Sequence, residues 1–384
     1  MTRRVLFIDP VCPTPYQART LYDRALGGTE ASAVRVAEGL AQAGHRVTVA
    51  QCGRGWPSRS PGGVAYVPFR YDGDWGHLPR AGAVVVLRQH KVLPRVRKRF
   101  QDARLALWLH CVPGSKRRSL ATALRDADAT AVCVSDAHRG AVHDYLRRVA
   151  DDGPATAPTV RIHNPVDDDL RPDGTPVDPD KLVFFSSPHK GLDEVLAAFA
   201  HVRERRPTAR LYVADPGYWT GDRPALPDGV IPLGALPHRA VMRHVREAFA
   251  VFYPQASFEE TFGLVFAEAN AVGTPVIAHP FAAACEVLGE TVAEGRQLID
   301  ARDPEAAAKR LVRWWDEGRP DVGGAQVAGA ERFRTSRVVR DWERLLGLER
   351  PDRPAVRRVD LDTAVPAPLL IGAATPPAGV PAGA

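Results

Sequence analysis

Two glutamates in the stretch SFEETFGLVFAEANAVGTPVIAH (Ser257–His279) have the clearest potential for chemistry. Glu260 lies in a polar loop, and Glu268 follows after seven intervening residues, inside a segment that is otherwise apolar and small. Burial of a charge costs free energy unless the charge is paired. A vicinal diol such as that of a ribose offers two donors to one carboxylate, which only accepts hydrogen bonds. Two interpretations of Glu268 follow: it binds such a ligand, or it pairs with a nearby arginine or is exposed.

The elements around these glutamates favour a ligand site. The apolar run Ala248–Pro254 predicts a strand, and Glu260 follows it, at the carboxyl end where open α/β sheets bind ligands. The segment from Gly263 predicts a helix, whose free N–H groups and positive dipole end favour a phosphate. We therefore expect a phosphate between the two carboxylates.

Short apolar runs alternate with helix-length segments along the whole chain. Runs without polar alternation are typical of parallel strands covered on both faces. We predict a helix over Thr29–Gly44, with Thr29 as its N-cap and Gly44 as its stop. The predicted strands are Arg4–Asp9, His45–Gln51, Ala83–Arg88, Leu105–His110, Thr130–Ser135 and Thr159–Asn164, then Leu182–Ser187, Ala209–Asp215, Gly229–Gly234, Ala248–Pro254 and Thr274–His279.

A proline- and aspartate-rich segment, Asn164–Lys181, interrupts this rhythm and predicts a linker. The fold class is therefore α/β, with one Rossmann-like parallel-sheet domain over residues 1–166 and a second over 167–324. A cleft between two such domains is a common ligand site. A long amphipathic helix is predicted over 325–347, and the proline- and alanine-rich tail over 349–384 is predicted to be disordered.

The composition is that of a soluble globular protein: 45% of the 384 residues are hydrophobic and 25% are charged. No apolar run is long enough to span a bilayer, and the N-terminus MTRRVLFIDP lacks the apolar core of a signal peptide. We therefore expect a cytoplasmic protein. The five cysteines are scattered and form no C-x-x-C pair, which indicates reduced core residues and neither disulfides nor a zinc site.

The net charge of +6 is compatible with nucleotide phosphates, an anionic membrane or nucleic acid as partners. The basic clusters Arg95–Phe100 and Ser115–Leu120 lack the interleaved aromatics typical of nucleic-acid binding, so no nucleic-acid partner is expected. Two interpretations remain, a solvated helix face and peripheral docking at the inner face of an anionic membrane.

The stretch FEETFGLVFAEANAVGTPVIA resembles the E-x7-E segment of family 4 glycosyltransferases, which are retaining, metal-independent enzymes of the GT-B fold. The resemblance extends over most of residues 3–346 and implies two Rossmann-like domains facing across a cleft. It implies that Glu260 contacts hydroxyls of the transferred sugar and that Glu268 holds the ribose of the nucleotide. The backbone amides of the turn Thr261, Phe262, Gly263 and Leu264 would contact the donor.

The same resemblance extends to the first half of the chain. LGGTEASAVRVAEGLAQAGHRVTV (Leu26–Val49) resembles the family's glycine-rich loop and helix, where Gly27 and Gly28 would let the backbone approach a phosphate. Taken alone, this pair also fits a simple turn. His110, at the end of LWLH, resembles the histidine near the reacting sugar, and the alternative is a structural histidine. HNPVD (His163–Asp167) resembles an architectural segment, and the helix over 325–347 resembles one that crosses back onto the first domain.

One departure from the family pattern concerns the leaving diphosphate. The family has an arginine and a lysine in G-R-x-x-x-x-K-G, whereas FFSSPHKG retains Lys190 with no arginine before it; Ser186 and Ser187 stand near that place. His189 or an arginine from elsewhere could replace the missing cation, and Lys190 could instead be an exposed lysine at a helix start. Glu286, in the stretch Phe281–Glu290, could contact the donor or cap a helix.

These features predict a retaining glycosyltransferase that uses a nucleotide-diphosphate sugar, with UDP or GDP as the expected nucleotide and no cofactor or metal. The candidate catalytic residues are His110, Glu260 and Lys190. The acceptor is a glycolipid, a polysaccharide or a specialised metabolite. The alternatives are a pseudo-glycosyltransferase that joins an activated cyclitol to an amine, and a non-catalytic nucleotide-sugar-binding protein of the same fold, suggested by the missing arginine.

Overall fold

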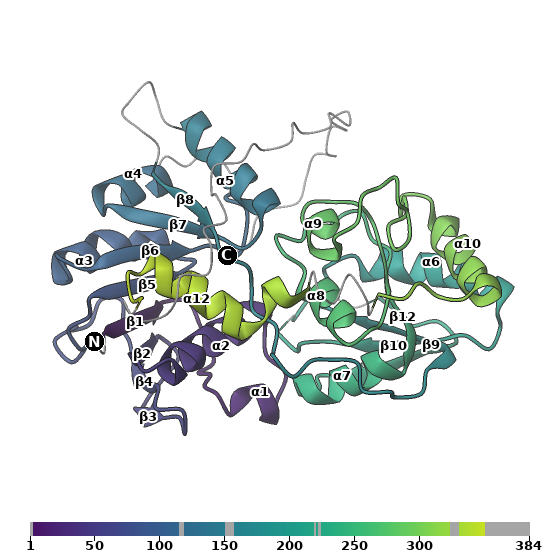
Figure 1. Cartoon of the computed structure of the whole chain (residues 1–384), viewed down its shortest axis with the longest axis horizontal. Coiled ribbons are helices and arrows are strands. Elements are labelled where there is room, and N and C mark those ends of the chain that lie inside the picture. The colour runs from purple at the N-terminus through teal and green to yellow at the C-terminus, as the bar shows by residue number, and fades with distance from the viewer. Residues whose placement is uncertain are drawn as a thin grey trace. The chain divides into compact units, whose positions relative to one another are not determined.

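The first half of the chain folds around a mainly parallel sheet (Figure 1). The computed structural model describes residues 3–114, 119–149, 157–218, 220–221, 224–322 and 330–349. Within them the strand order is β3-β4-β2-β1-β5-β6-β7-β8, and only the β3–β4 pair is antiparallel. The strands are β1 (Arg4–Asp9), β2 (Arg46–Gln51), β3 (Ser58–Arg59), β4 (Ala65–Pro68), β5 (Ala83–Leu87), β6 (Arg104–Trp108), β7 (Ala129–Cys133) and β8 (Thr159–Arg161).

Both faces of this sheet are covered, as the continuous apolar runs predict. In β1, Val5 and Phe7 belong to one buried cluster, whereas Leu6 and Ile8 belong to another on the opposite face. The helices of this half are α1 (Thr20–Asp23), α2 (Gly28–Gln42), the 3₁₀ turn η1 (His90–Val92), α3 (Leu93–Arg99), α4 (Ser119–Asp126) and α5 (Asp136–Val149). The basic cluster Arg95–Phe100 lies largely on α3, and residues 115–118 of the second cluster lie outside the described residues.

The second half contains an all-parallel sheet with the order β11-β10-β9-β12-β13 among the described residues. Its strands are β9 (Asp178–Phe185), β10 (Arg210–Ala214), β11 (Val230–Gly234), β12 (Ala248–Tyr253) and β13 (Val276–Ala278). Its helices are α6 (Leu192–Arg205), α7 (His238–Glu247), α8 (Leu264–Ala271), α9 (Ala284–Leu288) and α10 (Pro304–Glu317). The predicted α/β class with two parallel sheets is therefore confirmed.

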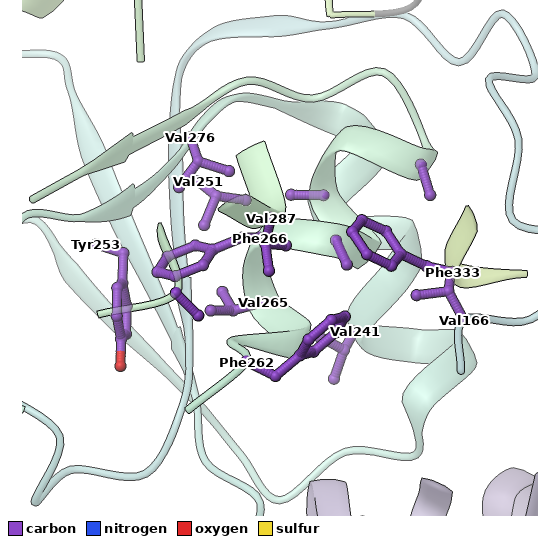
Figure 2. Close-up of a cluster of buried hydrophobic side chains, with 14 of the residues drawn as sticks. Val166, Val241, Val251, Tyr253, Phe262, Val265, Phe266, Val276, Val287 and Phe333 are labelled. Atoms are coloured by element: carbon purple, nitrogen blue, oxygen red, sulfur yellow. The ribbon is translucent and has the colours of Figure 1, made fainter. Parts of the chain in front are cut away.

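Helix α8 is enclosed on every side, and it carries Glu268, the second of the two glutamates. Each residue from Val265 to Ala271 is buried, Glu268 included. Figure 2 shows Val265 and Phe266 of this helix among Phe262, Val251 and Tyr253. A helix that is apolar all round belongs in a core, so Glu268 needs polar partners inside the protein.

The C-terminal helix is shorter than predicted. Residues 323–329 lie outside the described residues, Glu331–Phe333 form the 3₁₀ turn η2, and α12 spans only Thr335–Leu345. A continuous helix over 325–347 is therefore wrong. Arg334 interrupts it because its backbone is extended and bridges to Val166.

Helix α12 packs against α2 and the first sheet. Trp342 is fully buried, with its ring centroid 4.8 Å from that of Trp108 and 6.4 Å from that of Phe7. Contacts of this kind join Met1–Leu348 into one unit of the chain. The predicted tail over 349–384 lies almost entirely outside the described residues, and the division at residues 166 and 167 stays a prediction.

Other differences are local. Helix α2 begins at Gly28 with Gly27 as its N-cap, so Thr29 lies inside the helix and is not the cap. Strand β9 begins at Asp178, inside the predicted linker, and the short strands β3 and β4 were not predicted. No helix within the described residues is both long and apolar enough to cross a membrane.

Candidate active site

Glu260 lies in the loop after β12 and is held by two side chains of the second half. Its Oε1 lies 2.9 Å from Lys190 Nζ and accepts a hydrogen bond of 2.8 Å from the Tyr253 hydroxyl. Lys190 Nζ also lies 3.2 Å from Oε2. The predicted sugar-binding carboxylate and the predicted phosphate-binding cation are therefore brought together, and they neutralise each other.

The loop that carries Glu260 is fixed by its own side chains. The Gln255 amide accepts from Phe258 N at 2.7 Å and donates to Phe258 O at 3.0 Å. The loop ends at Gly263, whose φ of 77° lies in the left-handed region that favours glycine. A Cβ at Gly263 would lie 2.4 Å from a ring carbon of Phe266. Glycine is thus required for the turn that starts α8.

Glu268 finds partners inside the protein. Its Oε1 lies 2.9 Å from His238 Nε2, at the start of α7, and 3.5 Å from Arg35 Nη2 of α2. Arg35 also forms a double hydrogen bond with the carboxylate of Asp167, at 2.7 and 2.8 Å. Glu268 thus pairs with an arginine, one of the interpretations left open, and Oε2 of Glu268 makes no hydrogen bond within the described residues.

The predicted glycine-rich loop lies beside the start of α8. A Cβ on Gly28 would lie 3.0 Å from Leu264 Cδ1, so the missing side chain permits this close approach of α2 to α8. The first N–H groups of both helices lack intrahelical partners, and each helix start has a partial positive charge. The two helix starts could therefore share an anionic ligand. Glu30, in the first turn of α2, reduces that positive potential.

His110 follows β6 and has an unpaired ring nitrogen. Its Nε2 is buried and has no hydrogen-bond partner within the described residues. Burial, with the nearby Arg88 and His138, lowers the pKa of His110 well below its usual value. The imidazole is therefore neutral at pH 7, with one ring nitrogen able to donate a hydrogen bond and the other able to accept one.

The turn after Glu260 connects the two halves through the side chain and the backbone of Thr261. The Thr261 hydroxyl donates to His110 O at 2.9 Å, and the Ser135 hydroxyl donates to Thr261 O at 2.6 Å. The Phe262 ring is buried against Phe333, at a centroid distance of 5.2 Å. Only the backbone of Phe262 could therefore serve a ligand.

Sequence reasoning missed Arg88, which follows β5 close to His110. It adopts a left-handed φ of 59°, which is uncommon for a residue other than glycine. Its Nη2 lies 3.0 Å from Glu30 Oε1 and 3.3 Å from both carboxylate oxygens of Asp9. The signal in the sequence was an arginine directly after an apolar strand, at the sheet edge where ligands bind.

Glu286 caps a helix of the other half. Its Oε2 accepts from the backbone N–H groups of Asp136 and Ala137 at the start of α5, at 2.8 and 3.2 Å. Its Oε1 lies 2.9 Å from His163 Nε2. Burial opposes ionisation, but the hydrogen bonds from His163 and the backbone outweigh it, and the pKa of Glu286 is lowered. Of the two interpretations left open, the cap is the one that this geometry matches.

The place of the missing arginine holds neutral groups. The Ser187 hydroxyl lies 2.9 Å from His189 Nδ1, and burial together with Lys190 lowers the pKa of His189. His189 is therefore a poor substitute for a permanent cation. Among the described residues, no group of three or more His, Cys, Asp or Glu side chains could hold a metal ion.

Solved structures show the class of fold. HepE of Anabaena, determined with UDP and glucose, superposes with a TM-score of 0.64 over 90% of this chain and 100% of its own, at 17% identity. An α,α-trehalose-phosphate synthase (UDP-forming) of Burkholderia xenovorans, determined with glucose 6-phosphate, gives 0.66 over 90% and 100%, at 13% identity. The fold is thus GT-B, with two Rossmann-like sheets.

The sequence comparisons concern a smaller part of the chain. Residues 168–321 match the family described as "Glycosyl transferases group 1". A D-inositol 3-phosphate glycosyltransferase of Frankia alni is 36% identical over 155 residues, which is 35% of this chain and 37% of that relative. The match thus spans little more than a third of the relative's length. Glu260, Glu268 and Lys190 all lie within the residues matched to the family.

Proposed function

We propose that this protein is a retaining glycosyltransferase that moves a sugar from a nucleotide-diphosphate sugar to an acceptor hydroxyl. The observation that carries the proposal is the arrangement around α8. Glu260 and Glu268 flank the start of this helix at the carboxyl edge of the second sheet, inside the residues that match the glycosyl transferase family.

In the proposed complex, each carboxylate binds a different part of the donor. Glu268 accepts hydrogen bonds from the ribose diol through Oε2, which has no hydrogen-bond partner among the described residues, and Glu260 binds hydroxyls of the transferred sugar. The backbone amides from Thr261 to Leu264 bind the diphosphate. The start of α2 at Gly27 and Gly28 adds further N–H groups, which partly compensates for the missing arginine.

The proposed reaction breaks the bond between the anomeric carbon and the diphosphate oxygen. A bond to the acceptor oxygen forms on the same face, and the acceptor proton passes to the departing diphosphate. His110, whose neutral imidazole has no partner for Nε2 in the part of the chain that the structure describes, hydrogen-bonds the sugar near the reacting carbon. Lys190 must move from Glu260 toward the diphosphate or bind both, because charge on the leaving group has to be stabilised.

The donor class is supported by the two structures of similar fold described above: one was determined with UDP and glucose, and the other is a synthase described as UDP-forming. We propose UDP as the first donor nucleotide to test and GDP as the second. The relatives named for D-inositol 3-phosphate make a cyclitol phosphate one acceptor to include. A glycolipid or polysaccharide acceptor, and peripheral contact with an anionic membrane, remain part of the proposal.

A thermal-shift panel of UDP, GDP, ADP, TDP and CMP tests the first step. A ligand that binds the native state raises the unfolding temperature by mass action, so the matching nucleotide should stand out. The sugar nucleotides of that base are then incubated with candidate acceptors, and products are identified by mass spectrometry. No response at millimolar concentration would reject the proposal, and tight binding without turnover would support a non-catalytic binding protein.

A further inference from the structure

Arg35 is an unexpected residue in the middle of α2. Its neighbours Val34 and Val36 are fully buried, and the Arg35 side chain is only 3% exposed. A buried guanidinium is costly unless it is paired. Here its double hydrogen bond with Asp167 supplies that pairing, and the neighbouring Asp167 carboxylate raises the pKa of Arg35 against the effect of burial.

Arg35 has a second acidic neighbour. Its Nη2, which donates to Asp167 Oδ2 at 2.8 Å, lies 3.5 Å from Glu268 Oε1, an ion-pair contact longer than a hydrogen bond. His238 lies on the other side, with Nε2 2.9 Å from the same Glu268 oxygen and Nδ1 3.9 Å from Asp167 Oδ2. Two side chains from different halves of the chain thus converge on one oxygen of Glu268.

We propose that Arg35 and His238 are positioning residues for Glu268. They hold Oε1 so that Oε2 is presented to the ribose hydroxyls of the nucleotide. The inference rests on the proposed function, because it concerns the carboxylate assigned there to the ribose.

The contacts of Glu268 with Arg35 and His238 suit a carboxylate that binds the two hydroxyls of a diol. A carboxylate that accepts two hydroxyl hydrogen bonds must be ionised and fixed in orientation. Arg35 supplies a permanent positive charge, and the hydrogen bond to His238 fixes the rotamer of Glu268. Since Arg35 belongs to α2, a helix of the first half helps to prepare the nucleotide site of the second half. The affinity for the nucleotide should therefore depend on a residue that never touches it.

The test compares two buried arginines that both donate hydrogen bonds to Asp167. Arg35 binds the carboxylate of Asp167, whereas Arg334 donates to its backbone carbonyl at 3.0 Å and, among the described residues, forms no hydrogen bond or ion pair with Glu268. The nucleotide found by the thermal-shift panel is titrated calorimetrically into wild type, Arg35→Lys and Arg334→Lys. We expect Arg35→Lys to weaken binding about tenfold, the equivalent of about 1.4 kcal/mol, and Arg334→Lys to change it less than twofold.

A double-mutant cycle shows whether Arg35 acts through Glu268. In a Glu268→Gln background, Arg35→Lys should have no further effect on the nucleotide affinity. An undiminished effect there, or equal losses in Arg35→Lys and Arg334→Lys, would overturn the proposal and indicate general destabilisation of the junction.

If the Arg35 variant fails to fold, substitutions of His238 test the positioning of Glu268 instead. His238→Gln keeps an N–H donor near the position of Nε2 and should retain wild-type affinity, whereas His238→Phe should weaken binding severalfold. Equal affinities in these two variants would overturn the proposal for His238. Absence of any nucleotide response in the wild type is a separate result, which would overturn the proposed function and this inference together.

Discussion

The pairing of Lys190 with Glu260 leads to an unusual prediction for Glu260→Gln. The substitution keeps the shape of the side chain and an acceptor for the Tyr253 hydroxyl, but it removes the charge that neutralises Lys190. Lys190 then becomes available to a diphosphate, and the repulsion between diphosphate and carboxylate disappears. We expect the variant to bind a nucleoside diphosphate more tightly than the wild type does, while it loses activity.

The size of the effect follows from the geometry. Two unit charges 4 Å apart interact by about 4 kcal/mol at an effective dielectric constant of 20. The Lys190 and Glu260 side chains are 21% and 10% exposed, and pairs near the surface contribute about 1 kcal/mol or less after desolvation and screening. About 1 kcal/mol corresponds to about fivefold tighter binding.

The activity should change in the opposite direction. Loss of charged hydrogen bonds to the sugar costs about 2–3 kcal/mol, so kcat/KM for transfer should fall about 100-fold. Calorimetric titration measures the first effect, and a product-release assay measures the second. Glu259→Gln is the matched control, because Glu259 lies in the same loop and is exposed. Weaker binding of the nucleoside diphosphate to a correctly folded Glu260→Gln variant would refute the reasoning.

Three further predictions concern stability and the first turn of α8. Burial lowers the pKa of His110 and of His138, so the native state keeps both neutral while the unfolded chain takes up protons below pH about 6.5. The free energy of unfolding should therefore fall on acidification below that pH, by up to about 1.4 kcal/mol per pH unit for each histidine. Chemical denaturation at several pH values measures this slope, and an unchanged slope in His110→Gln would contradict the prediction. Gly263→Ala should cost about 1–3 kcal/mol from the left-handed backbone alone, with more from the contact with Phe266, and should abolish the thermal response to nucleotide. Glu286→Ala should lower stability by about 0.5–2 kcal/mol through loss of the α5 cap and speed amide exchange in the first turn of α5, whereas a loss of nucleotide affinity without a loss of stability would favour the donor-contact role.

The sequence predicts the core strands well because each is an apolar run with clear ends. For β1, the predicted and observed bounds agree at Arg4–Asp9. Strand β3 at the sheet edge and its neighbour β4 are short and partly exposed, so they have no comparable apolar pattern. The length of α12 depends on Arg334, which leaves the helical conformation while its guanidinium binds backbone carbonyls of the junction. A contact so distant in sequence leaves no local pattern.

The residues of the candidate site were also found where their sequence signal is local and missed where it is not. Glu260 and Glu268 were found because their spacing and their apolar context are local properties. Arg35 and His238 were missed because each gains its role from the folded chain, although an arginine between valines in a helix is a signal of a buried ion pair. Among the residues assigned to the first half, the structure brings Gly28 beside Leu264, and His110 touches Thr261 through its backbone carbonyl.

Helix α2 has a consequence for how the two halves can be exchanged between proteins. A hybrid joined at residues 166 and 167 would keep the strands of each Rossmann-like sheet together. It would nevertheless separate Arg35 from Asp167 and Glu268, its acidic partners. Removal of one partner of a buried ion pair lowers the free energy of unfolding by about 3–5 kcal/mol. The two sheets are separate in topology, but a buried charge of the first half is neutralised by the second half. A working hybrid must therefore carry α2 together with Asp167, which neutralises Arg35.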